Sequence, residues 1–454
     1  MADVAKLFDE AIAARQRQDT EGAVDAINSA QTAAPNNAQI AAVRAQLYYE
    51  TWRPAADLFD RALKLTPGDL QLLRNKALAL SVEGDRKGAQ ALLEQQLAIQ
   101  PDWIDGHNVL TKMRLTSGEA GDHDRSFADA CERSPTSLPL HLAWFHNASI
   151  KRDWSKARHI IEKAEVLFRN RKPLDAARFY IASESGDDAD IDSLLLAIAD
   201  MQDPGLDLCR VRLYLRTGNF DEAETVASRH IGAASALLFW PYISLIWRLT
   251  ANPLAAWLDG DPLFVKTVDL DFSSTELGAL ADTLRTLHIL QAPYPEQSVR
   301  GGTQTDRPLF FNPDSVIQTA RARITGAVQD YLDALPDLDP PHPLLSPHRH
   351  EIYFEGSWSV RLQDNGYHAS HTHVMGWVSS AFYASLPETP GPPPAGWLGL
   401  GTPPPELSLD LTAYAEVEPK PGRLALFPST MWHSTYPFEA GERLTVAFDV
   451  RRPQ

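Results

Sequence analysis

The sequence predicts a multidomain α + β protein, in which an array of paired α-helices precedes an antiparallel β domain of the barrel or jelly-roll class. Over about the first 250 residues, apolar residues recur at helical spacing and prolines return at regular intervals. Beyond Glu351, short segments alternate apolar and polar residues and are separated by turns. At about 150 residues per domain, a chain of 454 residues accommodates this division, which we place at 1–250 and 251–454.

The prolines of the first half mark a repeat. Pro35, Pro67, Pro101 and Pro135 are separated by 32, 34 and 34 residues. An alanine lies twelve residues before each of the first three, and a large apolar residue follows four positions later: Ala23 with Ile27, Ala55 with Phe59, and Ala89 with Leu93. A small residue lets two helices cross closely, and proline ends the second helix of each unit. This order, with its period of about 34 residues, resembles tetratricopeptide (TPR) repeats, whose usual use is to bind a peptide or partner protein in a concave groove.

The repeat weakens after Pro135 and returns around Ala157. A connector with two prolines and a glycine is expected over 247–265. Two further helices are expected over 274–291 and 315–335, before the chain becomes rich in proline and then turns to β structure.

Composition excludes several classes of protein. Lys and Arg number 42 and Asp and Glu 59, so the formal net charge is −17, and such a surface repels nucleic acid. The apolar run Phe239–Trp247 has nine residues, far fewer than the about 20 that a membrane-spanning helix needs, so no membrane association is expected. Cys131 and Cys209 are too few for a disulfide framework, and the first residues lack the apolar run of a signal peptide. A cytoplasmic location is therefore expected.

The chemistry is concentrated in two short stretches. His371 and His373 are two residues apart, so on a strand both imidazoles face the same side. His433 follows an apolar strand about sixty residues later; three ligands on one side leave three positions open on an octahedral iron(II). Arg443 opens the next apolar strand, and a buried guanidinium needs an anionic partner. The distal carboxylate of 2-oxoglutarate would serve; the alternative is a surface ion pair, for example with Glu439.

Two segments carry a family resemblance. The segments GYHASHTHVMGWVSSAFYASLPE (366–388) and PGRLALFPSTMWHSTYPFEAGERLTVAFDV (421–450) resemble the iron(II)/2-oxoglutarate dioxygenases that are fused to TPR repeats in bacteria. These enzymes belong with the prolyl-hydroxylase-like double-stranded β-helix proteins. The resemblance covers roughly residues 265–454, and it implies a double-stranded β-helix (jelly-roll or cupin-like) with flanking helices.

The resemblance also implies roles for particular residues. His371, His373 and His433 match the iron ligands, Arg443 matches the residue that grips 2-oxoglutarate, and Tyr383 matches a cosubstrate contact. Most of the wider superfamily has Asp or Glu where His373 stands. An all-histidine set therefore leaves the metal one negative charge short.

The function implied is that of a hydroxylase that uses iron(II), 2-oxoglutarate and dioxygen, with a protein or peptide substrate recruited through the TPR groove. Two alternatives stay open. The chain could be a small-molecule hydroxylase whose TPR half forms a homodimer or recruits partners, or a non-catalytic TPR adaptor with a degenerate metal-binding barrel.

Other interpretations of single features also stay open. His348 and His350 form a second His-x-His pair that could hold the metal instead. On a strand, His368 would face away from both ligands, which suggests a supporting role. The three selected histidines could form a structural metal site or a hydrogen-bond network. The loop 387–405, rich in proline and glycine, is either a lid over the site or a plain surface connection.

Overall fold

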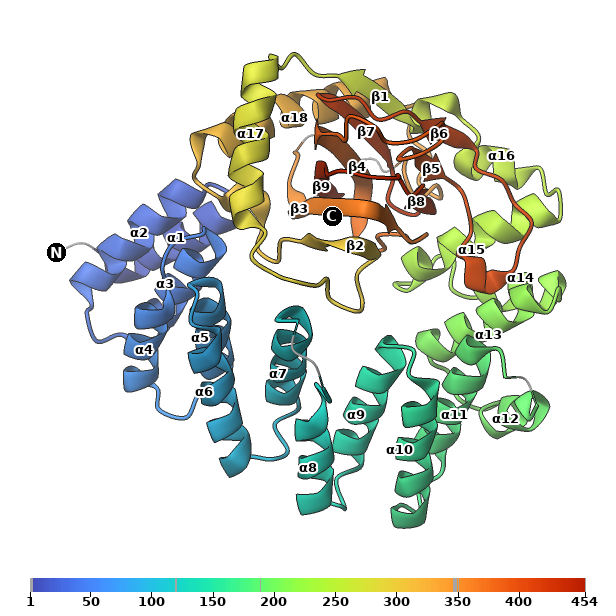
Figure 1. Ribbon diagram of the computed structural model, residues 1–454, viewed down its shortest axis with the longest axis horizontal. Coiled ribbons are helices and arrows are strands. Elements are labelled where there is room, and N and C mark those ends of the chain that lie inside the picture. Colours follow the sequence, from blue (N-terminus) through green and yellow to red (C-terminus); the bar gives the residue numbers. More distant parts are fainter. Residues whose placement is uncertain (1–2, 119–120, 188, 346–348, 350, 454) are drawn as a thin grey trace. The chain divides into compact units, whose positions relative to one another are not determined.

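The computed structural model describes residues 3–118, 121–187, 189–345, 349 and 351–453 (Figure 1). The chain forms two compact units. The first comprises Met1–Leu140, Ile289–Tyr294 and Thr305–Gln318, and the second His141–His288, Pro295–Gln304 and Thr319–Gln454. These units do not test the domain boundary that the sequence predicts near residue 250, which stays a prediction.

The first unit contains the first part of the helical-repeat array that the sequence predicts over 1–250, and the rest of that range belongs to the second unit. Each helix contacts the next along the chain, and the small and large residues of the repeat pattern are buried between them. Pro35, Pro67, Pro101 and Pro135 each lie two residues past the end of the second helix of a pair. The helices are α1 (Val4–Gln16), α2 (Thr20–Ala33), α3 (Ala38–Glu50), α4 (Ala56–Leu65), α5 (Leu70–Val82), α6 (Arg86–Ile99), α7 (Ile104–Thr116) and α8 (Arg125–Arg133).

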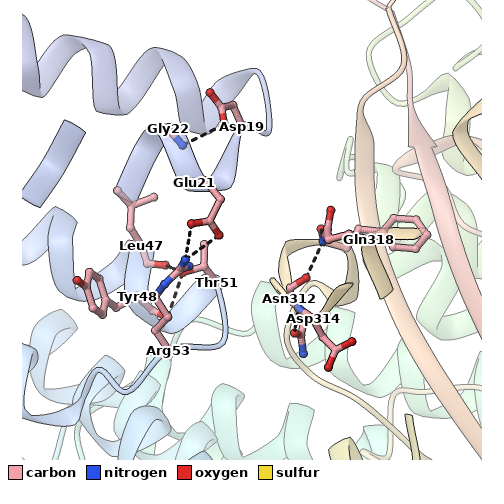
Figure 2. Close-up of polar contacts among 11 residues, drawn as sticks. Asp19, Glu21, Gly22, Leu47, Tyr48, Thr51, Arg53, Asn312, Asp314 and Gln318 are labelled. Atoms are coloured by element: carbon pink, nitrogen blue, oxygen red, sulfur yellow. Dashed lines mark hydrogen bonds and ion pairs between the residues drawn. The ribbon is translucent and has the colours of Figure 1, made fainter. Parts of the chain in front are cut away.

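An aspartate caps the start of the second helix in several repeats. The Asp19 carboxylate accepts a hydrogen bond from the backbone N–H of Gly22 at 3.0 Å, as Figure 2 shows. A Cβ on Gly22 would lie 2.2 Å from an Asp19 carboxylate oxygen, so a larger residue there would require the Asp19 side chain to shift. The same figure shows Arg53, just after α3, paired with Glu21 in the first turn of α2 at 2.7 Å. The cap fixes where α2 begins, and the ion pair connects its first turn to the end of α3.

Two later segments of the same chain, 289–294 and 305–318, belong to this unit. The indole N–H of Trp52 donates to the Pro308 carbonyl at 2.8 Å. The guanidinium of Arg307 lies 3.9 Å from the centroid of the Trp52 ring. The repeats of the first unit therefore bind part of their own chain.

Replacing Trp52 by alanine should lower the free energy of unfolding of this unit by about 2 to 4 kcal/mol. The change removes a cation–π contact of about 0.5 to 2 kcal/mol, a hydrogen bond of about 1 kcal/mol and aromatic packing. Denaturant unfolding would measure it. The control is Arg17→Ala, which breaks an exposed ion pair with Glu10 and should cost less than about 1 kcal/mol. Equal effects of the two changes would contradict this account.

The second unit joins helices and sheet in one core. Residues Phe239–Trp247 of α15 are all buried, and they pack in one cluster with Leu407 and Trp432 of the β region. Within the described ranges, no helix is long and apolar enough to cross a membrane. The helices are α9 (Leu138–Ile150), α10 (Trp154–Leu167), α11 (Lys172–Ser185), α12 (Ile191–Ala197), α13 (Pro204–Arg216), α14 (Phe220–Ser228), α15 (Ala236–Leu249), α16 (Leu254–Asp259), α17 (Ser274–Leu287) and α18 (Ser315–Ala334). The first and the last of these, α9 and α18, begin in the first unit.

The strands form two antiparallel sheets, as the fold-class prediction requires (Figure 1). The larger has the order β1-β7-β4-β9-β3-β2 and the smaller β6-β5-β8. Because strand order does not follow chain order, segments distant in sequence become neighbours, such as Ser379 of β4 and Asp449 of β9. The strands are β1 (Lys266–Asp269), β2 (Val299–Gln304), β3 (Phe354–His368), β4 (Gly376–Ser385), β5 (Leu398–Leu400), β6 (Ala415–Val417), β7 (Arg423–Pro428), β8 (His433–Thr435) and β9 (Arg443–Arg451).

Candidate active site

Three histidines converge in the second unit. His433 begins β8, and it forms an isolated antiparallel bridge with His371, with backbone N–H···O distances of 3.0 Å in both directions. His373 lies two residues further along the same loop. One ring nitrogen from each of the three lies within 4.8 Å of the others. The structure thus brings together the three residues that the sequence selects as metal ligands.

The backbone that positions these histidines differs from the strand that the sequence predicts. His371 and His373 do not lie on a continuous strand, because β3 ends at His368. The bridge to His433 holds the loop instead. His368 does not face away from the ligands, as strand alternation led us to expect: its ring lies 5.9 Å from that of His371 and lines the same cavity. The alternation fails because the strand has already ended. His348 and His350 lie outside the described residues.

Each of the three imidazoles has its Nδ1 on an acceptor. His371 Nδ1 donates to the Ala369 carbonyl at 2.8 Å, and His433 Nδ1 donates to the Met431 carbonyl at 3.0 Å. His373 Nδ1 contacts both carboxylate oxygens of Asp449, at 2.7 and 2.8 Å. A carbonyl or carboxylate can only accept, so these contacts place the proton on Nδ1 and the lone pair on Nε2. Metal-binding histidines are commonly oriented in this way.

Electrostatics keeps two of these rings neutral. Burial holds the pKa of His371 well below its ordinary value, and the neighbouring imidazoles lower it further. Burial does the same to the pKa of His433, with His373 adding to it. Burial also lowers the pKa of His368 to about 3. Metal binding needs imidazole in its neutral form, so His371 and His433 can bind a cation without first releasing a proton at neutral pH.

Arg443 and Tyr383 form a second cluster. Arg443 begins β9 and its side chain is buried, with the residue only 3% exposed. Its Nη1 donates to the Gly396 carbonyl at 2.9 Å, and its guanidinium carbon lies 5.0 Å from the centroid of the Tyr383 ring. Among the described residues, the Arg443 Nε and the Tyr383 hydroxyl are buried without a hydrogen-bond partner, and the ion pair with Glu439 is not formed. Burial lowers the pKa of Arg443.

These orphaned donors suit an anion. A buried guanidinium is costly unless a hydrogen-bonded counter-charge accompanies it. A carboxylate placed against Arg443 would accept from its free N–H, and the Tyr383 hydroxyl could donate to the same group. The residues therefore fit the distal carboxylate of a dicarboxylic acid such as 2-oxoglutarate.

The histidines and Arg443 line one cavity of about 780 Å³. Alternate residues of β9 face it, since Arg443, Thr445, Ala447 and Asp449 all contribute to its wall. The opposite wall comes from the helical repeats of the second unit, through Ser149, Trp154, Tyr180 and Arg212. The helices and the sheet thus build the site together.

The loop 387–405 supports Arg443. It contains β5, which pairs with β8, the strand that begins at His433. The Gly396 carbonyl that accepts from Arg443 also lies in this loop. The loop therefore holds Arg443 and β8 in place. Whether it also moves as a lid over the site stays a prediction.

Helix α15 supports His433. The indole N–H of Trp432 donates to the Pro241 carbonyl of α15 at 2.9 Å, and the Tyr242 ring packs edge-on against Trp432 at 5.4 Å. The residue before the third histidine is therefore held by the helical half of the unit.

Sequence reasoning missed Asp449. The signal was present, because Asp449 is six residues after Arg443 on the same strand and period-two alternation puts both on one face. Ser298 was also missed: its hydroxyl lies 3.1 Å from His371 Nε2 and 3.0 Å from His368 Nδ1. No motif marks it, since it comes from a connection preceding β2.

No curated protein sequence matches this chain. Among solved structures, a prolyl-4-hydroxylase from Pseudomonas putida aligns over 42% of this chain and 94% of its own, with 16% identity and a TM-score of 0.29. A 2OG-Fe(II) oxygenase family oxidoreductase from Burkholderia pseudomallei aligns over 42% and 87%, with 14% identity and a TM-score of 0.28. A tetratricopeptide repeat protein from Parabacteroides merdae aligns over 55% and 99%, with 13% identity and a TM-score of 0.35.

One family model matches the sequence itself. Residues 356–449 match the model described as "Putative 2OG-Fe(II) oxygenase". The matched range holds His371, His373, His433 and Arg443, together with Asp449 at its end. Over residues 356–449 the chain is therefore similar to the 2OG-Fe(II) oxygenase family.

Proposed function

We propose that the protein is an iron(II)- and 2-oxoglutarate-dependent dioxygenase that hydroxylates a C–H bond of a protein or peptide. One observation carries the proposal: ring nitrogens of three histidines converge in the same cavity as a buried arginine whose Nε has no partner among the described residues. The first group suits a metal ion and the second suits an anion.

The residues fit iron(II) with 2-oxoglutarate. Three neutral imidazoles bind borderline metals such as iron(II), zinc, nickel and copper, and three protein ligands leave positions for other molecules. Bound there, iron(II) with 2-oxoglutarate and dioxygen would supply the oxidising chemistry, which yields succinate, carbon dioxide and a hydroxylated substrate.

The chain's own residues would bind the cosubstrate and the metal ion and orient them. Arg443 would pair with the distal carboxylate of 2-oxoglutarate, and Tyr383 would donate to it. His371, His373 and His433 would hold their lone pairs on the metal through the contacts at Nδ1. The burial of these groups keeps bulk water away from the reacting atoms, which strengthens each of these interactions.

The cavity wall supports a peptide substrate. The repeat helices α9, α10, α11 and α13 contribute side chains to the cavity that holds the histidines. Trp154 and Tyr180 lie there with ring centroids 6.4 Å apart, and aromatic side chains are common anchors in protein interfaces. A cavity of about 780 Å³ lies toward the upper end of the range for small-molecule sites, which leaves room beyond the cosubstrate.

The test of the cosubstrate is an anaerobic titration of the metal-free protein with iron(II) and then 2-oxoglutarate. We expect the weak visible charge-transfer band of an iron–2-oxoglutarate chelate. The full chain is needed, because removal of residues 1–250 would remove the α15 carbonyl that holds Trp432 beside His433. Bound iron without a band on addition of 2-oxoglutarate would refute the proposal.

The test of the substrate class follows on the same protein. The iron- and 2-oxoglutarate-loaded enzyme is mixed in air with a library of random peptides, and mass spectrometry reports which peptides gain one oxygen atom. We expect gain of oxygen together with succinate release. Succinate release without any oxidised peptide would reject the peptide assignment and favour a small-molecule substrate, whereas no succinate under any condition would favour the non-catalytic adaptor.

A further inference from the structure

Asp449 is a buried carboxylate in direct contact with His373. Both of its oxygens lie 2.7 to 2.8 Å from His373 Nδ1, and the hydroxyl of Ser379 donates to one of them at 2.6 Å. The residue is 7% exposed. Among the described residues, no lysine or arginine pairs with it.

The surrounding chain is shaped for this contact. Ser379 is the register partner of Asp449 on the neighbouring strand, so its hydroxyl is delivered by the sheet itself. Gly376 lies beside them, and a Cβ there would come within 3.0 Å of the Asp449 Cβ and 2.6 Å of the Ser429 hydroxyl. The backbone thus approaches the carboxylate more closely than any other residue at position 376 would permit.

The three histidines are not supported equally. His371 and His433 donate to the neutral carbonyls of Ala369 and Met431. Only His373, among the three, donates to an anion. A carboxylate acceptor raises the electron density of the imidazole and so its strength as a ligand through Nε2.

The burial of the Asp449 carboxylate without a lysine or arginine partner among the described residues needs a physical explanation. Burial of a charge is expensive unless it is compensated, and the donors that reach Asp449 are a serine hydroxyl and an imidazole N–H. A cation bound at Nε2 of His373 would supply the missing compensation across the ring. The carboxylate would in turn supply negative charge that three neutral imidazoles lack.

We propose that Asp449 is a positioning residue for the metal. It fixes the His373 ring with Nε2 toward the site and provides, through that ring, the negative charge that a two-histidine, one-carboxylate site places directly on the metal. This inference rests on the proposed function only in requiring that the three histidines bind a metal ion.

The test measures cobalt(II) affinity of the metal-free full chain, without 2-oxoglutarate or oxygen. Asp449→Asn keeps the shape of the side chain and an oxygen acceptor but removes the charge. Loss of such a supporting group typically weakens metal binding about 10- to 100-fold, and we expect that range. The visible spectrum of the bound cobalt(II) should also shift, because the donor strength of His373 falls while the ligand set stays the same.

The matched control is Asp259→Asn. Asp259 is another buried aspartate of the second unit, 8% exposed, and it accepts hydrogen bonds from two hydroxyls, those of Ser244 and Tyr414. It does not line the cavity. Cobalt(II) affinity and spectrum should be unchanged there. Equal weakening in both variants, or an affinity of Asp449→Asn within about twofold of the wild type, would overturn the inference.

A measurement on the unchanged protein covers the case in which Asp449→Asn fails to fold. In zinc(II)-loaded protein with ¹⁵N-labelled histidine, one Nδ1 proton should resonate clearly downfield of those of the other two ligands, because its acceptor is charged. Three similar resonances would overturn the inference. If the wild type binds neither cobalt(II) nor zinc(II), the proposed function itself fails, so the two failures are distinguishable.

Discussion

Arg443→Ala is expected to remove 2-oxoglutarate binding at ordinary concentrations while the metal stays in place. The substitution leaves a desolvated carboxylate without its partner, which costs about 2 to 5 kcal/mol when one member of a buried charge pair is truncated. That is a loss of about 30-fold to several thousand-fold in affinity. Metal affinity should hold, since Arg443 is not one of the converging ligands. Calorimetric titration of 2-oxoglutarate into zinc(II)-loaded protein measures the first quantity, and titration of the metal-free protein measures the second.

Two further variants test the role of Arg443: one separates its charge from its geometry, and the other is a control on the same strand. Arg443→Lys keeps a positive charge but loses the planar fork, so we expect an affinity between those of the wild type and the alanine variant. Arg451→Ala, on the same strand, removes an exposed pair with Glu355 and should leave 2-oxoglutarate binding unchanged. If Arg443→Ala binds 2-oxoglutarate as the wild type does, the assignment of the second cluster is wrong.

Local pattern was enough for the helical repeats and for the choice of histidines. The alanine and large apolar positions are buried because helix packing repeats the same contacts in each unit, and that periodicity is visible in one dimension. His371, His373 and His433 stood out because few histidines follow each other two residues apart beside short β segments. The helices predicted over 274–291 and 315–335 are found at Ser274–Leu287 and Ser315–Ala334.

Contacts that depend on strand register could not be predicted. His373 and Asp449 are 76 residues apart, and they meet only because β4 pairs with β9 in a particular alignment. The contribution of Trp154 and Tyr180 to the cavity wall is hidden for the same reason, because it follows from the packing of helices and sheet in one unit. The sequence also gave no sign that segments 289–294 and 305–318 return to the first unit.

His433→Ala is expected to weaken metal binding by on the order of several hundred-fold. A four-ligand structural zinc site binds with about 10 to 16 kcal/mol, or about 3 to 4 kcal/mol for each ligand, and every 1.4 kcal/mol is tenfold. His433 supplies one of three ligands, so no other side chain in the cluster can replace it. Calorimetric titration of the metal-free protein with zinc(II) measures the loss, and the charge-transfer band with iron(II) and 2-oxoglutarate should vanish with it.

His368→Ala is the control that makes this result specific. His368 is a half-buried histidine of the same cavity, with its Nδ1 on the Ser298 hydroxyl, but it does not belong to the converging set. Its removal perturbs packing against His371 without removing a ligand, so metal affinity should fall by less than about tenfold. A loss at His368 as large as that at His433 would mean that the metal is held by a different group of histidines. The geometry argues against that outcome, because only His371, His373 and His433 present nitrogens within 4.8 Å of one another among the described residues.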